Sequence, residues 1–380
     1  MSLQKLSLTL VLLVVILALM PVAAQEDNPR AVVESFYTWY LDYAGYDEDA
    51  DVFRNPIVDG SYRERAELKP ALIEAIDAQE ERFADPFLCA QDLPHAAEYE
   101  VIDSQHVLVN LYFGYSPHPH TLVVGLQDGL IANVDCMETA TARGTAWNFY
   151  YHVIEDRDSL EIGSSPLLTD ALNAQLSEAL KRPLPLREGD PVVCAHDHPQ
   201  YASVHLISRD GDRAKMLVRE FFANDPNPHL ITLDMVKGEN WQIDTINCAI
   251  MPEDIAAYLY NEFVAFRKYD IERDLDQTPL MDWNPYPWAN FMREELYDEL
   301  VTIYSSDAPR PVDPFLCAQD TPERVLAEAI LGPQSDSVAV QIKGMFSSGP
   351  DSFDTVELAT ATMTTDENGI WQIAEITCTR

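Results

Sequence analysis

The sequence predicts an α+β protein of three tandem domains, each with two to three helices packed on a curved antiparallel sheet. The octapeptide DPFLCAQD occurs at Asp85–Asp92 and again at Asp313–Asp320, and a divergent copy, DPVVCAHD, lies between them at Asp190–Asp197. Each copy follows helix-like segments and precedes strand-like segments, the last of which ends in a second cysteine. A period this long does not suit a solenoid and suits tandem domains.

The repeat sets the expected domain boundaries. We expect unit one at residues 28–139, a divergent unit two at 141–250 and unit three at 252–380. The closing strands support this division, because WQIDTINC at Trp241–Cys248 and WQIAEITC at Trp371–Cys378 share most of their letters.

Residues 1–24 are typical of a secretory signal peptide. Lys5 precedes the apolar run Leu6–Met20, which is short for a membrane span, and Val22–Ala24 fits the small-residue cleavage rule. An uncleaved N-terminal anchor is the alternative. With the signal removed, we expect a secreted or cell-envelope protein without a transmembrane segment.

The charge of the chain excludes some classes of partner. There are 25 Lys and Arg residues against 63 Asp and Glu, a formal net charge of −38. Such a surface repels nucleic acid and anionic lipid headgroups, so we expect no nucleic-acid partner. It attracts cationic partners or loosely held divalent ions, although a purely solubilising surface is the simpler interpretation.

The first unit is expected to open with a helix over Val32–Tyr40, capped by Asn28 with Pro29 at the first helical position. A second helix is expected over Arg63–Arg82, in which Pro70 marks either the true start or a kink. The expected strands are Tyr99–Ile102, His106–Tyr115, Thr121–Leu126 and Leu130–Cys136, with a hairpin turn at Asp128–Gly129.

The same order is expected twice more. The predicted helices are Thr145–Ile154, Leu167–Leu180, Ile255–Phe266 and Trp288–Ile303. The predicted strands are His205–Ser208, Ala214–Phe222, Leu230–Val236, Trp241–Cys248, Val325–Ile330, Val338–Phe346, Thr355–Thr364 and Ile370–Cys378.

The closing strand of unit two changes phase along its length. Trp241 and Ile243 are expected on one face, whereas Ile246 and Cys248 fall on the other. Either both faces are covered, or a β-bulge lies near Asp244–Thr245. We favour the bulge, in a sheet that curls over its helices.

The cysteines predict a covalent scaffold, because each unit contains two of the six. Similar units should pair internally, which an exported protein permits. The expected disulfides are Cys89–Cys136, Cys194–Cys248 and Cys317–Cys378. Zinc binding is the alternative, but the chain has no Cys-x-x-Cys pair.

The octapeptide also offers paired carboxylates, which can perform acid–base chemistry. Its last aspartates, Asp92, Asp197 and Asp320, are candidate site residues, although an aspartate here can equally bond the backbone amides of a turn. His196 and His198 flank Asp197 in a metal-like cluster that the other two copies lack. We therefore assign no catalytic residue, cofactor or metal site.

Asp282–Trp288, DWNPYPW, has no counterpart in the other units. Its Trp283, Tyr286 and Trp288 are candidate partner contacts, because aromatic side chains between prolines can hold a protein or a glycan. A packed loop is the alternative. The chain has no glycine-rich phosphate loop, Gly-x-Ser-x-Gly elbow, His-Glu-x-x-His or EF-hand pattern.

Three features together resemble a bacterial envelope domain of unknown function (number 3828 in that series). They are the Phe-x-x-Trp-Tyr of the first helix, Asp-Pro-Phe-Leu-Cys-Ala-Gln-Asp-x-Pro, and a closing Trp-x-Ile-x-x-Ile-x-Cys strand. The resemblance covers units one and three well and unit two weakly. It implies export, often as a lipoprotein, although this chain has no lipobox cysteine. That family is similar to the cone-shaped group of nuclear transport factor 2 and ketosteroid isomerase, which implies a curved sheet around helices with a pocket at its mouth.

Repetition without catalytic motifs, an acidic surface and disulfides favour a secreted or cell-envelope binding protein without catalytic activity. Its partner would be an unknown extracytoplasmic protein or small ligand, and no cofactor is expected. One alternative is a hydrolase or isomerase-like enzyme that uses the pocket of one unit. A second is an acidic protein that binds divalent cations.

Overall fold

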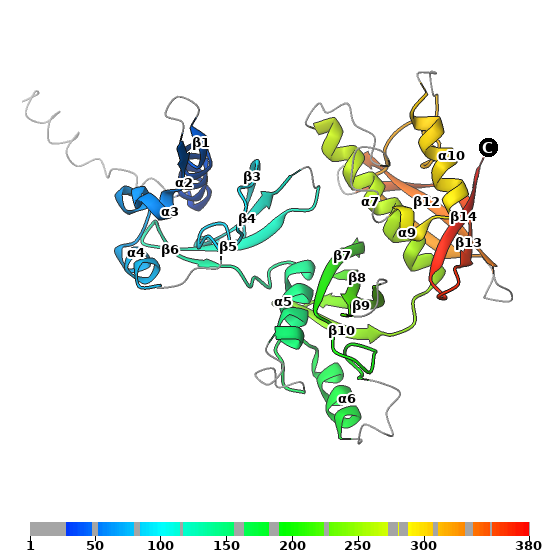
Figure 1. The fold of residues 1–380 in the computed structure, drawn as a ribbon, viewed down its shortest axis with the longest axis horizontal. Coiled ribbons are helices and arrows are strands. Elements are labelled where there is room, and N and C mark those ends of the chain that lie inside the picture. The colour runs from blue at the N-terminus through cyan, green and yellow to red at the C-terminus, as the bar shows by residue number, and fades with distance from the viewer. Residues whose placement is uncertain are drawn as a thin grey trace, which may run out of the picture. The chain divides into compact units, whose positions relative to one another are not determined.

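In the part of the chain that the structure describes, the protein has an α+β fold with three four-stranded antiparallel sheets and a small number of helices (Figure 1). In this computed structural model the described residues are 28–47, 52–79, 84–114, 117–155, 163–181, 190–223, 228–272, 280, 288–306, 311–330, 337–349 and 352–379. Every four-stranded sheet is a meander, in which each strand pairs with its neighbour along the chain. The predicted α+β class is therefore confirmed.

The first sheet follows a set of short helices. These elements are α2 (Pro29–Tyr43), the two-stranded hairpin β1 (Gly45–Asp47) and β2 (Val52–Arg54), α3 (Pro56–Asp59), the 3₁₀ helix η1 (Ser61–Glu64) and α4 (Pro70–Asp77). The sheet contains β3 (Ala96–Val101), β4 (His106–Tyr112), β5 (His120–Gln127) and β6 (Leu130–Asp135). Pro70 begins α4 and does not kink a longer helix, which fits its missing amide hydrogen. Asp128 and Gly129 have φ of 52° and 74°, as the predicted tight hairpin turn requires.

The second and third sheets follow the same order of elements. The second part contains α5 (Ala142–Glu155), α6 (Asp170–Leu180), β7 (Tyr201–Asp210), β8 (Arg213–Phe221), β9 (His229–Lys237) and β10 (Trp241–Asn247). The third contains α7 (Pro252–Glu272), α9 (Trp288–Phe291), α10 (Glu294–Tyr304), β11 (Arg324–Ala329), β12 (Ser337–Gly349), β13 (Ser352–Thr365) and β14 (Trp371–Cys378).

The last strand of each four-stranded sheet contains a bulge. In β10 the register shifts between Ile243 and Thr245, which confirms the predicted bulge at Asp244–Thr245. Corresponding shifts occur where β6 pairs with β5 and where β14 pairs with β13. The extra residue lets apolar side chains before and after it serve one curved core.

The same last strand also pairs with the residues just before a helix, which are those before α4, α6 and α10. Leu68, Leu168 and Met292 each form an isolated parallel bridge, to Ile131, Ile243 and Ile373 respectively. In each case the next residue donates its backbone amide to the carbonyl of that isoleucine at 2.9 Å. Backbone hydrogen bonds to the last strand therefore fix the residue at which the helix begins, and a strong helix propensity of the sequence is not needed for this.

The three expected disulfides are present, which confirms the predicted pairing. Cys89–Cys136, Cys194–Cys248 and Cys317–Cys378 have Cα–Cα distances of 5.6, 5.4 and 5.3 Å, within the usual range for a disulfide. Each joins the octapeptide to the end of its sheet.

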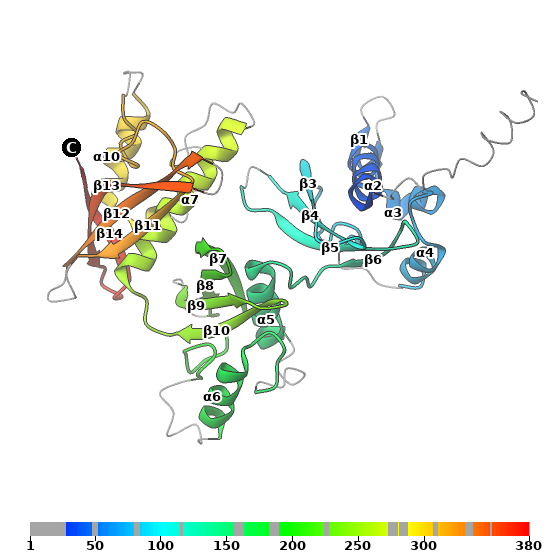
Figure 2. The ribbon, with the colours of Figure 1, turned by 180° about the vertical axis from the view of Figure 1, so that it is seen from behind.

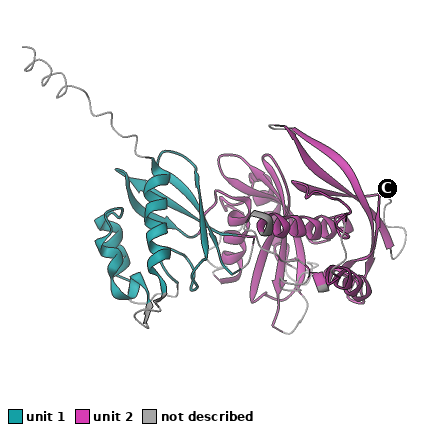
Figure 3. Cartoon of the chain, turned by 90° about the horizontal axis from the view of Figure 1, so that it is seen from above, with its two compact units in different colours: residues 1–114, 119–136 teal, residues 115–118, 137–380 magenta. Residues whose placement is uncertain are grey.

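The chain forms two compact units (Figure 3). Compact unit 1 covers residues up to 114 with 119–136, and compact unit 2 covers 115–118 with 137–380. These two compact units, written with numerals, are distinct from the expected repeat units one, two and three. The first sheet lies in unit 1 and the other two lie in unit 2. Each expected range contains one sheet, and the boundaries of three separate domains remain a prediction.

Unit 2 is held together by α7. One core contains residues of α7, of the third sheet, and Ile207, Leu217 and Leu230 of the second sheet. Met216 and Val218 alternate with Leu217 and belong to a different core, under α5, so the second sheet is covered on both faces (Figure 2).

Candidate functional site

Each octapeptide closes on itself through its first aspartate. Asp85 Oδ1 accepts hydrogen bonds from the backbone amides of Phe87 at 2.9 Å and Leu88 at 3.1 Å. Asp85 N donates to Ala90 O at 2.8 Å, and Cys89 N donates to Asp85 O at 2.7 Å. Cys89 has φ of 53°, in the left-handed region that non-glycine residues rarely adopt. The carboxylate and the disulfide together hold this conformation.

The other two copies make the same contacts. Asp190 Oδ1 accepts from Val192 N at 2.8 Å and Val193 N at 3.4 Å, and Asp313 Oδ1 accepts from Phe315 N at 3.0 Å and Leu316 N at 2.9 Å. Cys194 and Cys317 have φ of 53° and 56°. We call these three closed segments the disulfide loops: Asp85–Asp92, Asp190–Asp197 and Asp313–Asp320.

Tyrosines reinforce two of the first aspartates. Tyr40 Oη donates to Asp85 Oδ2, and Tyr304 Oη donates to Asp313 Oδ1 at 2.7 Å. Burial, with the carboxylate beside each hydroxyl, raises the pKa of both tyrosines far above the ordinary value of 10.0. These hydroxyls stay protonated and donating, so the first aspartate serves the fold.

The last aspartate of each disulfide loop has no such role. Asp92, Asp197 and Asp320 are exposed, and none of them makes a hydrogen bond or ion pair with another described residue. The alternative that this aspartate bonds turn amides is therefore wrong for the described residues. Since the loops close without these carboxylates, the carboxylates are available to an outside group.

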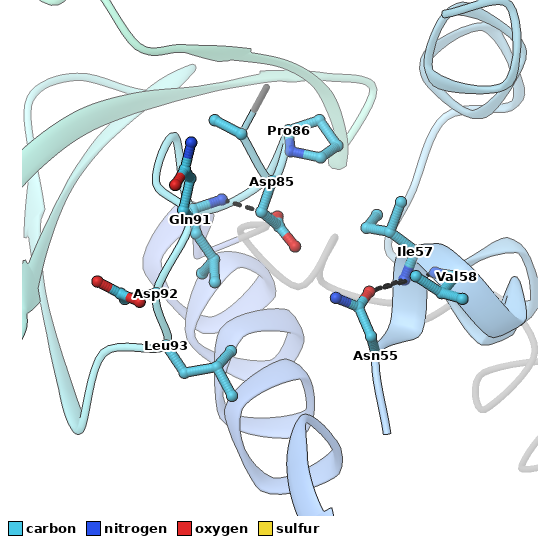
Figure 4. A pocket seen from close by; sticks show the side chains of 10 residues that line it. Asn55, Ile57, Val58, Asp85, Pro86, Gln91, Asp92 and Leu93 are labelled. Atoms are coloured by element: carbon cyan, nitrogen blue, oxygen red, sulfur yellow. Dashed lines mark hydrogen bonds between the residues drawn. The ribbon is translucent and has the colours of Figure 1, made fainter. Parts of the chain in front are cut away.

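In unit 1 the free aspartate borders a pocket of about 590 Å³. Figure 4 shows Gln91, Asp92 and Leu93 on one side and the start of α3, with Asn55 and Val58, on the other. Asn55 is occupied in capping α3, because its Oδ1 accepts from the amides of Ile57 and Val58. The carboxylate left for a ligand is that of Asp92, on the loop side.

A second pocket, of about 670 Å³, lies beside the middle loop in unit 2. We call it the histidine pocket; it is lined by Ala195, His196, Asp197, His198, Phe222, Ala223 and His229. The structure therefore brings the predicted His196, Asp197 and His198 together at one pocket. All three are exposed at its rim, which makes the pocket open.

A buried carboxylate that the sequence interpretation missed lies behind this pocket. Glu220 on β8 stands directly opposite His229 on β9, and its Oε2 lies 3.3 Å from His229 Nδ1. Glu220 is 0% exposed, and its Oε1 has no hydrogen-bond partner among the described residues. Burial raises the pKa of Glu220 to about 7, although His229 acts in the opposite direction.

The sequence contains one signal for His229. Phe-x-x-x-Pro-x-Pro-His occurs at Phe113–His120 and again at Phe222–His229. In both hairpins the phenylalanine and histidine rings meet edge to face, with centroids 6.3 Å apart. No comparable motif marks Glu220, because it lies in the ordinary inward and outward alternation of a strand.

Of the aromatic segment Asp282–Trp288 in unit three, the structure describes only Trp288, which is packed. Trp288 is 0% exposed, in the core with Phe263 and Phe315, so it is not a partner contact. Burying its large apolar ring is favourable, and this gain outweighs the tendency of a residue beside a proline to lie in an exposed loop. Trp283 and Tyr286 lie outside the described residues.

Two findings on the described residues and a comparison with known proteins complete the description of the site. Among the described residues no group of three or more His, Cys, Asp or Glu is arranged to hold a metal ion. No helix in the same part of the chain is both long and apolar enough to cross a membrane. The chain matches no protein-family model, no curated protein and no solved structure.

Proposed function

We propose that the protein is a secreted or cell-envelope binding protein without catalytic activity, which contacts its partner through the rims of its disulfide loops. One observation carries the proposal: the first aspartate of each loop is engaged by the fold, and the last is exposed and makes no hydrogen bond or ion pair with another described residue. Two of the last aspartates also border pockets, in different units.

The disulfides support the proposed location. Three intramolecular disulfides are typical of proteins that mature in an oxidising compartment. A signal peptide at 1–24 would deliver the chain there. We further propose three tandem cone-like domains of the nuclear transport factor 2 type, since every sheet is a bulged meander with helices against it.

The test compares two triple variants of equal charge. Asp92→Asn/Asp197→Asn/Asp320→Asn removes the free loop carboxylates. Glu100→Gln/Asp212→Asn/Asp354→Asn removes one exposed, unpaired acid beside each sheet and is the control. The immobilised mature chain is incubated with envelope extract, and captured proteins or small molecules are quantified by mass spectrometry.

The loop variant should lose the captured partner, whereas the control should retain it. Equal capture by both variants would show that binding does not use the loops. Absence of any saturable partner for the unmodified chain would remove the proposal.

A second candidate function rests on Glu220 and His229. A buried carboxylate against an imidazole at a pocket can orient a general base, as an acid–base enzyme needs. Turnover of p-nitrophenyl acetate by the whole chain, lost in both Glu220→Gln and His229→Gln and kept in His152→Gln, would favour this function. Equal background rates in all four proteins would remove it.

A further inference from the structure

The position of Glu220 is a buried position without an ionisable side chain in the other two four-stranded sheets. The amides of His95, Gln200 and Glu323 donate to the carbonyls of Tyr112, Phe221 and Met345 respectively, all at 2.7 to 2.9 Å. Counting back one residue from these carbonyls places Leu111, Glu220 and Gly344 at corresponding sites. Leu111 is buried in the core of unit 1, and it faces His120 as Glu220 faces His229. A carboxylate is therefore not needed to build this part of the sheet.

Burying a carboxylate at such a position is unfavourable unless it is fully bonded. Three ionisable groups face Glu220: His229 on β9, Asp190 at the start of the middle loop, and Tyr150 on α5. Only His229 forms a hydrogen bond with it, and Oε1 lacks a partner among the described residues. A buried polar group kept at this cost is typical of a functional site.

We propose that the histidine pocket binds an ammonium or guanidinium group, and that Glu220 supplies negative charge to the site through His229. This inference rests on the proposed binding function and names the chemistry of its ligand. Asp197 provides a free carboxylate at the rim, and Phe222 provides an aromatic ring suited to a cation–π contact. None of the described lining residues is Lys or Arg, so the basic side chains at the pocket are the three histidines His196, His198 and His229. The net charge of −38 steers cations toward the chain.

The geometry couples binding to a proton. A cation in the pocket favours the negatively charged carboxylate of Glu220 over its neutral, protonated form. Binding of the cation therefore releases the proton of this carboxyl near neutral pH. Affinity should then fall as the pH is lowered, and the fall should be close to tenfold per pH unit where one proton is exchanged.

Isothermal titration calorimetry on the full mature chain tests this with two probes. Spermidine represents a free polyamine, and a Gly-Lys-Gly peptide with blocked ends represents the side chain of a protein partner. Titrations at pH 5.5, 6.5 and 8.0 use the unmodified chain, Glu220→Gln, Glu220→Leu and the control Asp354→Asn. Glu220→Leu copies the residue of the corresponding site in unit 1, so it should fold; near-ultraviolet circular dichroism checks this.

We expect saturable binding of at least one probe at pH 8.0. Lowering the pH to 5.5, or introducing either Glu220 variant, should weaken this binding at least tenfold. Asp354→Asn should leave it unchanged. Binding of spermidine alone identifies a free polyamine as the source, and binding of the peptide identifies a protein side chain. No saturable binding at pH 8.0, equal affinity in Glu220→Leu, or tighter binding at pH 5.5 would overturn the inference. If these results occur while the loop aspartate variants still lose an envelope partner, the proposed function stands without this ligand.

Discussion

Asn261 on α7 pairs with Val325 on β11 as a neighbouring strand would. Its Oδ1 accepts from Val325 N at 2.7 Å, and its Nδ2 donates to Val325 O at 2.9 Å. The same Nδ2 donates to Ile207 O on β7 at 2.8 Å. One amide side chain therefore satisfies backbone groups on the edge strands of two sheets, where unpaired groups would be costly. This contact joins the second and third sheets, in addition to the apolar core that they share with α7.

Replacing Asn261 should therefore destabilise unit 2. Asn261→Leu keeps the approximate size but leaves three backbone groups without partners, and we expect a loss of about 3 kcal/mol in the free energy of unfolding. Urea denaturation followed by tryptophan fluorescence measures it. The control is Asn240→Ala in an exposed turn, which should change stability by no more than about 0.5 kcal/mol. Similar losses in both variants would argue against the role of Asn261.

Glu220 should make stability depend on pH. Its pKa is raised to about 7 in the folded chain from an ordinary value of 4.5, so the folded state retains a proton that the unfolded state has lost. Stability from this group is therefore lost as the pH rises from 4.5 to 7, and is constant above. Glu220→Leu should remove that slope and raise the free energy of unfolding at pH 8 by about 3 kcal/mol.

The reciprocal change in unit 1 is the matched control. Leu111→Glu places a carboxylate opposite His120 and should introduce a decrease in stability with rising pH that the unmodified unit 1 lacks. If Glu220→Leu is less stable than the unmodified chain at pH 8, Glu220 contributes to the fold and the functional interpretation of its burial is wrong.

The disulfide of unit 1 should stabilise that unit alone. Cys89→Ser/Cys136→Ser releases a loop of 47 residues, for which the chain-entropy estimate is about 4 kcal/mol. Calorimetry of the double variant should show one transition moved to lower temperature and a second, from unit 2, unchanged. A single transition that moves as a whole would mean that the two units unfold together.

Local features of the fold could be predicted from the sequence, and features that depend on distant residues could not. The bulge at Asp244–Thr245, the turn at Asp128–Gly129 and the disulfide pairs follow from alternation, turn chemistry and repetition. Sharing of α7 between two sheets could not be foreseen, because an amphipathic pattern shows which residues are buried and not against what. Asn261 reads as an ordinary polar helix residue until its partners are known.

The candidate site divides in the same way. His196, Asp197 and His198 are adjacent in the chain, and the structure places them together at the histidine pocket. Glu220 and His229 meet only through strand pairing, so their relation is invisible to a motif search. For Trp288 the sequence leaves a partner contact and a packed side chain open, and the structure places its ring in the core.

The division of labour within the disulfide loops can be measured most directly in unit 1. Asp85→Ala removes the acceptor for two backbone amides and for Tyr40, whereas Asp92→Ala removes a carboxylate that has no partner among the described residues. In paired urea denaturations, Asp85→Ala should lower the free energy of unfolding by about 3 kcal/mol and Asp92→Ala should change it by no more than about 0.5 kcal/mol. Equal losses in the two variants would contradict the account.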